Sequence, residues 1–155
     1  MAIDRTLALN VYVIGQQYKN SEFGATAAYI QTSANPPIVD MVNFWNGNID
    51  FSGQPVDPNL TSDVDITFTL IPLMFDMNGS PVHCVWATPI DKAIAITPVS
   101  NDMKARMLNP MQIFLDDNDK VANTYTYKLG VMLPAYNNYF ISLDPQIVNT
   151  GLGQR

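Results

Sequence analysis

The sequence predicts an all-β fold: a single-domain antiparallel β-sandwich, jelly-roll-like, with at most one or two short helical turns. Hydrophobic residues alternate with polar ones along several segments, and turn signals recur roughly every 8 to 15 residues. Eleven prolines are spread through the chain, most of them where strands should end. The 155 residues amount to one domain. We therefore expect residues 1–155 to form one sandwich of about eight to ten strands.

Three segments alternate with the period of two that is typical of half-buried strands. Their hydrophobic positions are Leu7, Leu9, Val11 and Val13; Val64, Ile66, Phe68 and Leu70; and Tyr125, Tyr127, Leu129, Val131 and Leu133. Successive side chains of a strand point to opposite faces of its sheet. Each set is therefore predicted to face the core, with the intervening Asp, Thr and Lys residues in solvent.

Turn signals separate these strands and predict three hairpins, at Asp76–Pro81, at Asp116–Lys120 and at Ala135–Asn138. The second is expected to join the Met111–Leu115 strand to the one that begins near Tyr125. The segment that favours a helix is Ser100–Leu108, with a capping serine at its start and Asn-Pro after its end.

The net charge and the small number of charged residues exclude some classes of binding partner. The net charge is −6, and charged residues make up 14% of the chain, against about 25% in ordinary domains. Because the few cations form no cluster, we expect no nucleic-acid partner. No hydrophobic run approaches the roughly 20 residues of a membrane helix, so no membrane span is expected. The N-terminus lacks the basic start of a signal peptide, and with one cysteine this favours a cytoplasmic protein.

The sequence offers little material for catalysis. His83 and Cys84 are the chain's one histidine and one cysteine. As strand neighbours they would point to opposite faces, with Val82, Cys84 and Trp86 inward and His83 and Val85 outward. We therefore expect a buried thiol, an exposed imidazole and no enzyme. A small hydrolase that uses His83 as its base is a third, weaker hypothesis.

An acidic cluster is the one feature that points to a cofactor. Asp116, Asp117 and Asp119 place three carboxylates in one predicted turn, together with Asn118. Calcium prefers such oxygen ligands, although the twelve-residue loop of a calcium-binding hand is missing. Clusters of this kind also suit plain turns. Calcium is thus an optional cofactor at these residues, and no other is expected.

Aromatic residues beside amides provide a candidate ligand site, formed by Trp45, Asn46, Asn48, Tyr136 and Asn138. Rings that stack on a sugar, with amides that hydrogen-bond to it, predict a carbohydrate-binding lectin, which calcium at the Asp116–Asp119 loop could assist. The simpler interpretation is that the rings belong to the core or its rim and that the asparagines serve turn geometry.

The C-terminal strands carry a family resemblance. A tyrosine-rich strand, Thr124–Val131, is followed by a hairpin and then by Tyr139–Ile147, which reads YFISLDPQI. This Asp-Pro-x-Ile ending resembles the bacterial inclusion body proteins, the PixA/AidA-like family, and Leu9–Ile14 resembles their opening strand. Gly15 departs from the family, where an Asp commonly follows that strand.

The resemblance implies a bacterial, cytoplasmic β-sandwich, stored in some members as crystalline inclusions and controlled in some by quorum sensing. The family supplies no catalytic residues. Our leading hypothesis is therefore a non-enzymatic protein that self-associates as a homo-oligomer or an ordered inclusion, with a role in storage or in a quorum- or stress-linked response. Glycans are the alternative partner.

Overall fold

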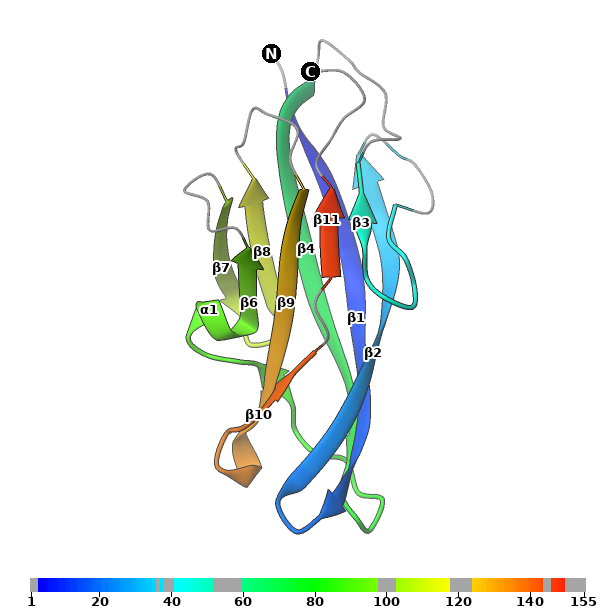
Figure 1. The fold of residues 1–155 in the computed structure, drawn as a ribbon, viewed down its shortest axis with the longest axis vertical. Coiled ribbons are helices and arrows are strands. Elements are labelled where there is room, and N and C mark those ends of the chain that lie inside the picture. Colours follow the sequence, from blue (N-terminus) through cyan, green and yellow to red (C-terminus); the bar gives the residue numbers. More distant parts are fainter. Residues whose placement is uncertain are drawn as a thin grey trace.

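The computed structural model describes residues 3–35, 37, 41–51, 60–97, 103–117, 124–143 and 146–149. These residues form two β-sheets that face each other in an elongated sandwich (Figure 1). The helical content is one four-residue α-helix and one three-residue 3-10 turn. The all-β fold and its limit of two helical turns are thus confirmed.

The strands of the described residues number eleven, slightly more than expected. In chain order the elements are β1 Ile3–Lys19, β2 Glu22–Asn35, β3 Ile49–Asp50, β4 Leu60–Phe75, β5 Val85–Trp86, α1 Ile90–Ala93, β6 Ile94–Thr97, β7 Met103–Asn109, β8 Gln112–Asp117, β9 Thr124–Leu133, η1 Pro134–Tyr136, β10 Tyr139–Ser142 and β11 Gln146–Asn149.

The first sheet is mixed, which differs from the antiparallel sheets that the sequence predicted. Its order is β2-β1-β4-β8-β7, and β1 pairs with β4 in parallel from Ile3↔Leu60 to Gln16↔Phe75. Parallel neighbours need a long crossover connection. Here the chain leaves β2, contributes β3 to the second sheet and returns as β4 on the far side of β1. This parallel pair also departs from a jelly roll, whose sheets are antiparallel.

The second sheet is built around β9. β5 and β6 pair with β9 through one edge and β10 and β11 through the other, and β11 pairs in parallel with β3. Ser142 lies opposite Gly130, and the N–H of Leu143 donates to the carbonyl of Leu129, 2.9 Å away. The pairing resumes at Gln146↔Tyr127, one residue out of step. The register against β9 therefore shifts by one residue between Leu143 and Gln146; Asp144 and Pro145 themselves lie outside the described residues.

The three predicted alternations are confirmed. Every residue of the three hydrophobic sets is buried, and the set on β1 and the set on β4 share one face of the first sheet. The rings of Phe68 and Tyr127 lie 5.6 Å apart between the two sheets and mark the centre of the core. Burial of these side chains supplies the main stabilisation of the sandwich.

The predicted helix at Ser100–Leu108 is wrong, because its described part is strand β7. Met103 is buried and Met107 half-buried, while Lys104 and Arg106 are exposed, which is the period of a strand. The capping serine and the Asn-Pro that favoured a helix mark only the ends of the segment. Packing against β8 therefore decided the conformation. The predicted stop at Asn109 became the turn of the β7–β8 hairpin.

The hairpin expected across Asp116–Lys120 is also wrong. β8 pairs with β4 and β7 in the first sheet, whereas β9 belongs to the second. Both strands direct hydrophobic side chains into the core, among them Ile113 and Tyr127, and so they face each other across the sandwich. Residues 118–123 between them lie outside the described part.

The other two predicted turns are present. At Asp76–Pro81 the N–H of Asp76 donates to the carbonyl of Ser80, 2.9 Å away, and Gly79 has φ 79°. Beyond the turn, the N–H of Val82 still donates to the carbonyl of Met74, 2.8 Å away, and the chain then crosses to the second sheet, where β5 pairs with β9. At the β9–β10 hairpin Asn137 and Asn138 both have φ 56°, a conformation that asparagine tolerates better than most residues.

Candidate functional site

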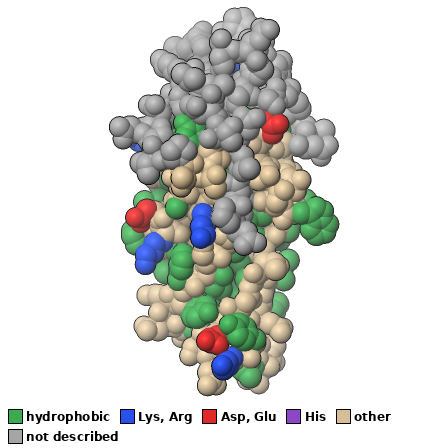
Figure 2. Space-filling model, viewed as in Figure 1, with side chains coloured by type: hydrophobic (Ala, Val, Ile, Leu, Met, Phe, Trp, Pro, Cys, Tyr) green, Lys and Arg blue, Asp and Glu red, His purple; other side chains and the backbone are tan. Residues whose placement is uncertain are grey.

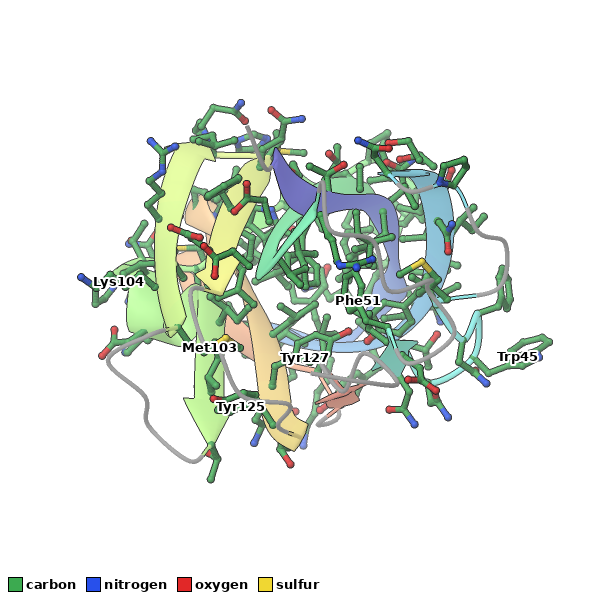
Figure 3. The ribbon with its side chains drawn as sticks, turned by 90° about the horizontal axis from the view of Figure 1, so that it is seen from above. Trp45, Phe51, Met103, Lys104, Tyr125 and Tyr127 are labelled. Carbon is green, nitrogen blue, oxygen red and sulfur yellow. The ribbon has the colours of Figure 1, made fainter. Side chains whose placement is uncertain are left out.

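The two edges of the first sheet differ in charge. β2 runs for 14 residues as an edge strand, and its single charged residue is Glu22, at its first position. β7, at the opposite edge, presents exposed Lys104 and Arg106. Figure 3 shows Lys104 and Trp45 projecting from opposite sides of the molecule, Trp45 from the loop beside β2. Natural proteins protect edge strands with lysine, proline or bulges. β2 has no lysine and no proline, and its register shift against β1, at Thr32, lies beyond the stretch from Phe23 to Gln31.

The outer backbone of β2 is oriented for pairing. The N–H of Tyr29 donates to the carbonyl of Phe44, 3.0 Å away, so it points away from β1. N–H and C=O groups alternate in direction along an antiparallel strand. Those of Phe23, Ala25 and Ala27 therefore also point away from β1, because the β1–β2 register has no shift between these positions. Within the described part of the chain, β1 is the one strand that pairs with β2.

A hollow of about 620 Å³ lies along this outer edge. Its walls come from β1, from β2, from the loop before β3 and from the end of β10, and they carry no charged side chain; they are Ile14, Ala25, Thr26, Ala27, Ala28, Tyr29, Phe44, Trp45, Asn46, Ser142 and Leu143. The inward row of β2 explains the space. Phe23 and Tyr29 are large and buried, whereas Ala25 and Ala27 between them are small and half-buried.

Gly15 of β1 brings the two strands of this edge close together. A Cβ atom at this position would lie 2.1 Å from the carbonyl oxygen of Gly24 and 2.8 Å from the Cβ of Ala25. Any side chain here would therefore push β2 away from β1. Gly15 therefore has a structural role in this chain.

The loop from Asn43 to Asn48 is fixed by its own hydrogen bonds. The side-chain oxygen of Asn43 accepts from the N–H groups of Trp45 and Asn46, at 2.9 and 3.1 Å. The carbonyl of Asn43 accepts from the N–H of Gly47, which has φ 74°. These bonds hold the indole of Trp45 in solvent, 81% exposed, edge-on to the ring of Phe44 at 4.7 Å.

A core tyrosine anchors this loop. The hydroxyl of Tyr127, a fully buried residue of β9, donates to the carbonyl of Gly47. Burial is the first cause that raises the pKa of Tyr127 well above 10.0, so the phenol remains a neutral donor. The second sheet thus positions the loop that carries Trp45.

The predicted sugar-binding residues do not form one site. Trp45 and Asn46 line the hollow, but Asn48, Tyr136 and Asn138 do not. The side-chain oxygen of Asn46 accepts from the N–H of Asn48 at 2.9 Å, and the ring of Tyr136 packs edge-on against Phe23 at 4.7 Å. Turn geometry and packing therefore account for most of these residues. Trp45 is the exception, because its ring is exposed to solvent and belongs neither to the hydrophobic core nor to the rim of the core.

The acidic cluster is divided between the faces of a strand. Asp116 and Asp117 are the last two residues of β8, and neighbouring positions of a strand belong to opposite faces of its sheet. Asp116 lies opposite Asp65 on one neighbouring strand and opposite Lys104 on the other. Asp119 lies outside the described residues, and those that are described include no group of three potential metal ligands. The prediction that Asp116 and Asp117 lie in a turn is therefore wrong, because both belong to strand β8.

His83 and Cys84 lie as the sequence predicted. His83 is exposed and Cys84 is buried, and burial raises the pKa of the Cys84 thiol to about 12. Thiolates are the reactive form of cysteine, so this thiol is inert at neutral pH. Val85, expected on the exposed side, is buried instead, because β5 begins at this residue and packs against β9.

The edge of β2, with Ala25 and Ala27 at its centre, was missed by sequence reasoning. The signal was present, since no charged residue and no proline occurs from Phe23 to Asn35. The alternation of this strand is weakened by its small residues, and so it did not stand out.

Comparisons with known proteins add no relative. A scan against protein-family models and a search of curated proteins found no match to this chain. No helix among the described residues is long and apolar enough to cross a membrane.

Proposed function

We propose that this chain is a non-enzymatic β-sandwich whose activity is to bind further copies of itself through the outer edge of β2. The observation that carries the proposal is a 14-residue edge strand with no lysine, arginine or proline. At Phe23, Ala25 and Ala27 this edge directs N–H and C=O groups away from β1, and such a row is a template for another strand. The β7 edge, with Lys104 and Arg106, would repel a second copy of itself.

The surface supports the same function. Charged side chains are few among the described residues on the face shown in Figure 2, where uncharged polar and hydrophobic types predominate. Copies of a protein with a net charge of −6 repel each other weakly at a distance, and this repulsion is screened beyond about 8 Å in physiological salt. An uncharged edge then lets two copies approach without opposing like charges.

The resemblance of the C-terminal strands to the inclusion body proteins points in the same direction. We place the chain in the bacterial cytoplasm, as an oligomer or an ordered inclusion that serves storage or a quorum- or stress-linked response. The described residues offer this function a binding edge, and the inert Cys84 and exposed His83 are consistent with a protein that does no chemistry.

A charge placed on the β2 edge tests the proposal. Thr26 is exposed on β2 and lines the hollow, so Thr26→Lys adds the cation that this edge lacks. Leu108→Lys is the matched control, because Leu108 is 44% exposed on the opposite edge. Light scattering after gel filtration, over a hundredfold range of concentration, gives the mass of each protein.

We expect the unaltered chain and Leu108→Lys to gain mass with concentration and Thr26→Lys to remain a monomer. Unfolding curves confirm that both variants are folded. A chain that remains a monomer at every concentration would rule out self-association as its function. Equal association of all three proteins would show that the chain self-associates through a surface other than the edge of β2.

Carbohydrate binding is a second candidate, favoured by the exposed indole of Trp45 beside an uncharged hollow. Binding pockets combine apolar walls with a few polar groups, and here Thr26, Asn46 and Ser142 supply the polar groups. A glycan array with and without calcium tests it, with Trp45→Ala as control. Binding that is lost in Trp45→Ala supports a lectin, and no binding in either condition excludes it.

A further inference from the structure

The geometry points to a specific interface: β2 of one copy pairs with β2 of a second copy, antiparallel and centred on Ala25, so that two five-stranded sheets become one of ten strands. This inference rests on the proposed self-association and names its contact. A two-fold axis makes the same surface patch meet itself.

The direction of the backbone groups selects the register. Phe23, Ala25 and Ala27 direct their N–H and C=O groups away from β1, and the N–H of Tyr29 is already bonded to Phe44. A two-fold axis at Ala25 places Ala25 opposite Ala25 and Phe23 opposite Ala27. These three positions then satisfy one another completely. An axis at Thr26 would instead place Phe23 opposite Tyr29, whose N–H is occupied.

The side chains fit the same register. On the inner face a large residue, Phe23, comes beside a small one, Ala27, whose Cβ atoms would lie about 4.5–5.5 Å apart. The aromatic cluster of Phe23, Tyr136 and Tyr139 in one copy thereby covers the hollow of the other. On the outer face Thr26 lies opposite Gly24, and Trp45, which lines the same hollow as Thr26, comes beside the second copy.

Charge also favours a second copy as the occupant. From Phe23 to Asn35 neither strand carries a charge. In this register Glu22 lies opposite Ala28, so the two Glu22 carboxylates are separated by six residue steps, about 20 Å. A strand of another protein that carried charged residues opposite this stretch would find no charged partner for them, either on β2 or in the walls of the hollow.

Cysteine cross-linking tests the register. Opposed residues of an antiparallel pair have Cα atoms about 4.5–5.5 Å apart, within the 4.4–6.8 Å that a disulfide spans. Diagonal neighbours are about 7–8 Å apart, which is too far. The variants are Ala25→Cys, Gly24→Cys and Thr26→Cys, each oxidised at a concentration where light scattering shows association. The native Cys84 is buried and contributes no background.

Ala25→Cys should form a covalent dimer by itself. Gly24→Cys and Thr26→Cys should each remain uncross-linked alone and form a mixed dimer when combined, because Gly24 faces Thr26 across the axis. Both of these positions are exposed, and a Cβ at Gly24 would meet the ring of Tyr18 at 3.8 Å, an ordinary contact, so these variants keep the fold. Cross-linking of Thr26→Cys alone would place the axis at Thr26 and overturn the inference. Association without any of these cross-links would overturn it too while leaving self-association intact; a chain that never associates fails both.

Discussion

The hydroxyl of Tyr127 donates to the carbonyl of Gly47, a residue 80 positions earlier in the chain. This bond joins the buried centre of the second sheet to the loop that holds Trp45 in solvent. Gly47 has a positive φ and follows the turn that Asn43 stabilises. The core thus determines the position of the most exposed tryptophan.

Tyr127→Phe removes this bond and leaves the ring in place. We expect a loss of about 1–3 kcal/mol in the free energy of unfolding, because a buried carbonyl loses its partner. Urea unfolding measures this loss. The control is Tyr12→Phe, since Tyr12 is half-buried on the outer face of β1. Equal stability of Tyr127→Phe and the unaltered chain would contradict the anchoring role.

A pair of proline variants tests the direction of the β2 backbone. The N–H of Ala27 points away from β1, so Ala27→Pro should cost less than about 1 kcal/mol and should abolish association. The N–H of Ala28 points toward β1, opposite Tyr12. Ala28→Pro should therefore cost about 1–3 kcal/mol or more through a lost ladder bond. Thermal unfolding and light scattering measure both effects, and a reversed order of stability would contradict the assigned direction.

Much of the sandwich could be predicted from the sequence, because it rests on local periodicity. The sets around Val11, Phe68 and Tyr127 alternate strictly, and all are buried. Strand pairing depends on distant contacts, which a single sequence does not encode locally. The parallel β1–β4 pair and the separation of β8 from β9 were therefore missed.

The candidate site was predictable only in part. Trp45 and Asn46 stood out as an aromatic beside an amide, and both line the hollow. Ala25 and Ala27 are ordinary residues whose importance comes from their position at a sheet edge. The helix expected at Ser100–Leu108 failed because its signals, a capping serine and a following Asn-Pro, mark the ends of a segment and do not reveal that it pairs with β8.

Trp45→Ala tests the contribution of the exposed indole. Trp45 contacts solvent over most of its surface, so the unfolding free energy should change by no more than about 0.5 kcal/mol. Association should weaken at least about fivefold, as expected when an exposed aromatic side chain is lost from an interface. Met77→Ala, also strongly exposed but in the turn after β4, should leave association unchanged. Analytical ultracentrifugation gives the association constants of the two variants. Equal constants would exclude Trp45 from the interface.

Stability should fall at alkaline pH. The pKa of the Cys84 thiol is about 12 in the folded chain against 9.0 for an ordinary thiol. The folded state then binds one more proton than the unfolded state between these values, so this contribution is complete below pH 9 and is lost as pH rises toward 12. Tyr127, whose pKa is raised well above 10.0, acts in the same direction.

Urea unfolding at pH 8 and at pH 10.5 measures the effect. Cys84→Ala should show a smaller decrease in stability between the two values than the unaltered chain, because one of the two groups is gone. An identical decrease in both proteins would show that the thiol does not contribute.

Hydrogen exchange of single amides tests the central claim most directly. In dilute protein the amides of Ala25 and Ala27 face away from β1 and should exchange rapidly, whereas that of Tyr29 is bonded to Phe44 and should exchange slowly. When the chain associates at high concentration, pairing between β2 strands should slow exchange at Ala25 and Ala27 at least tenfold and leave Tyr29 unchanged. Rapid exchange at both alanines in the associated protein would contradict the β2 interface.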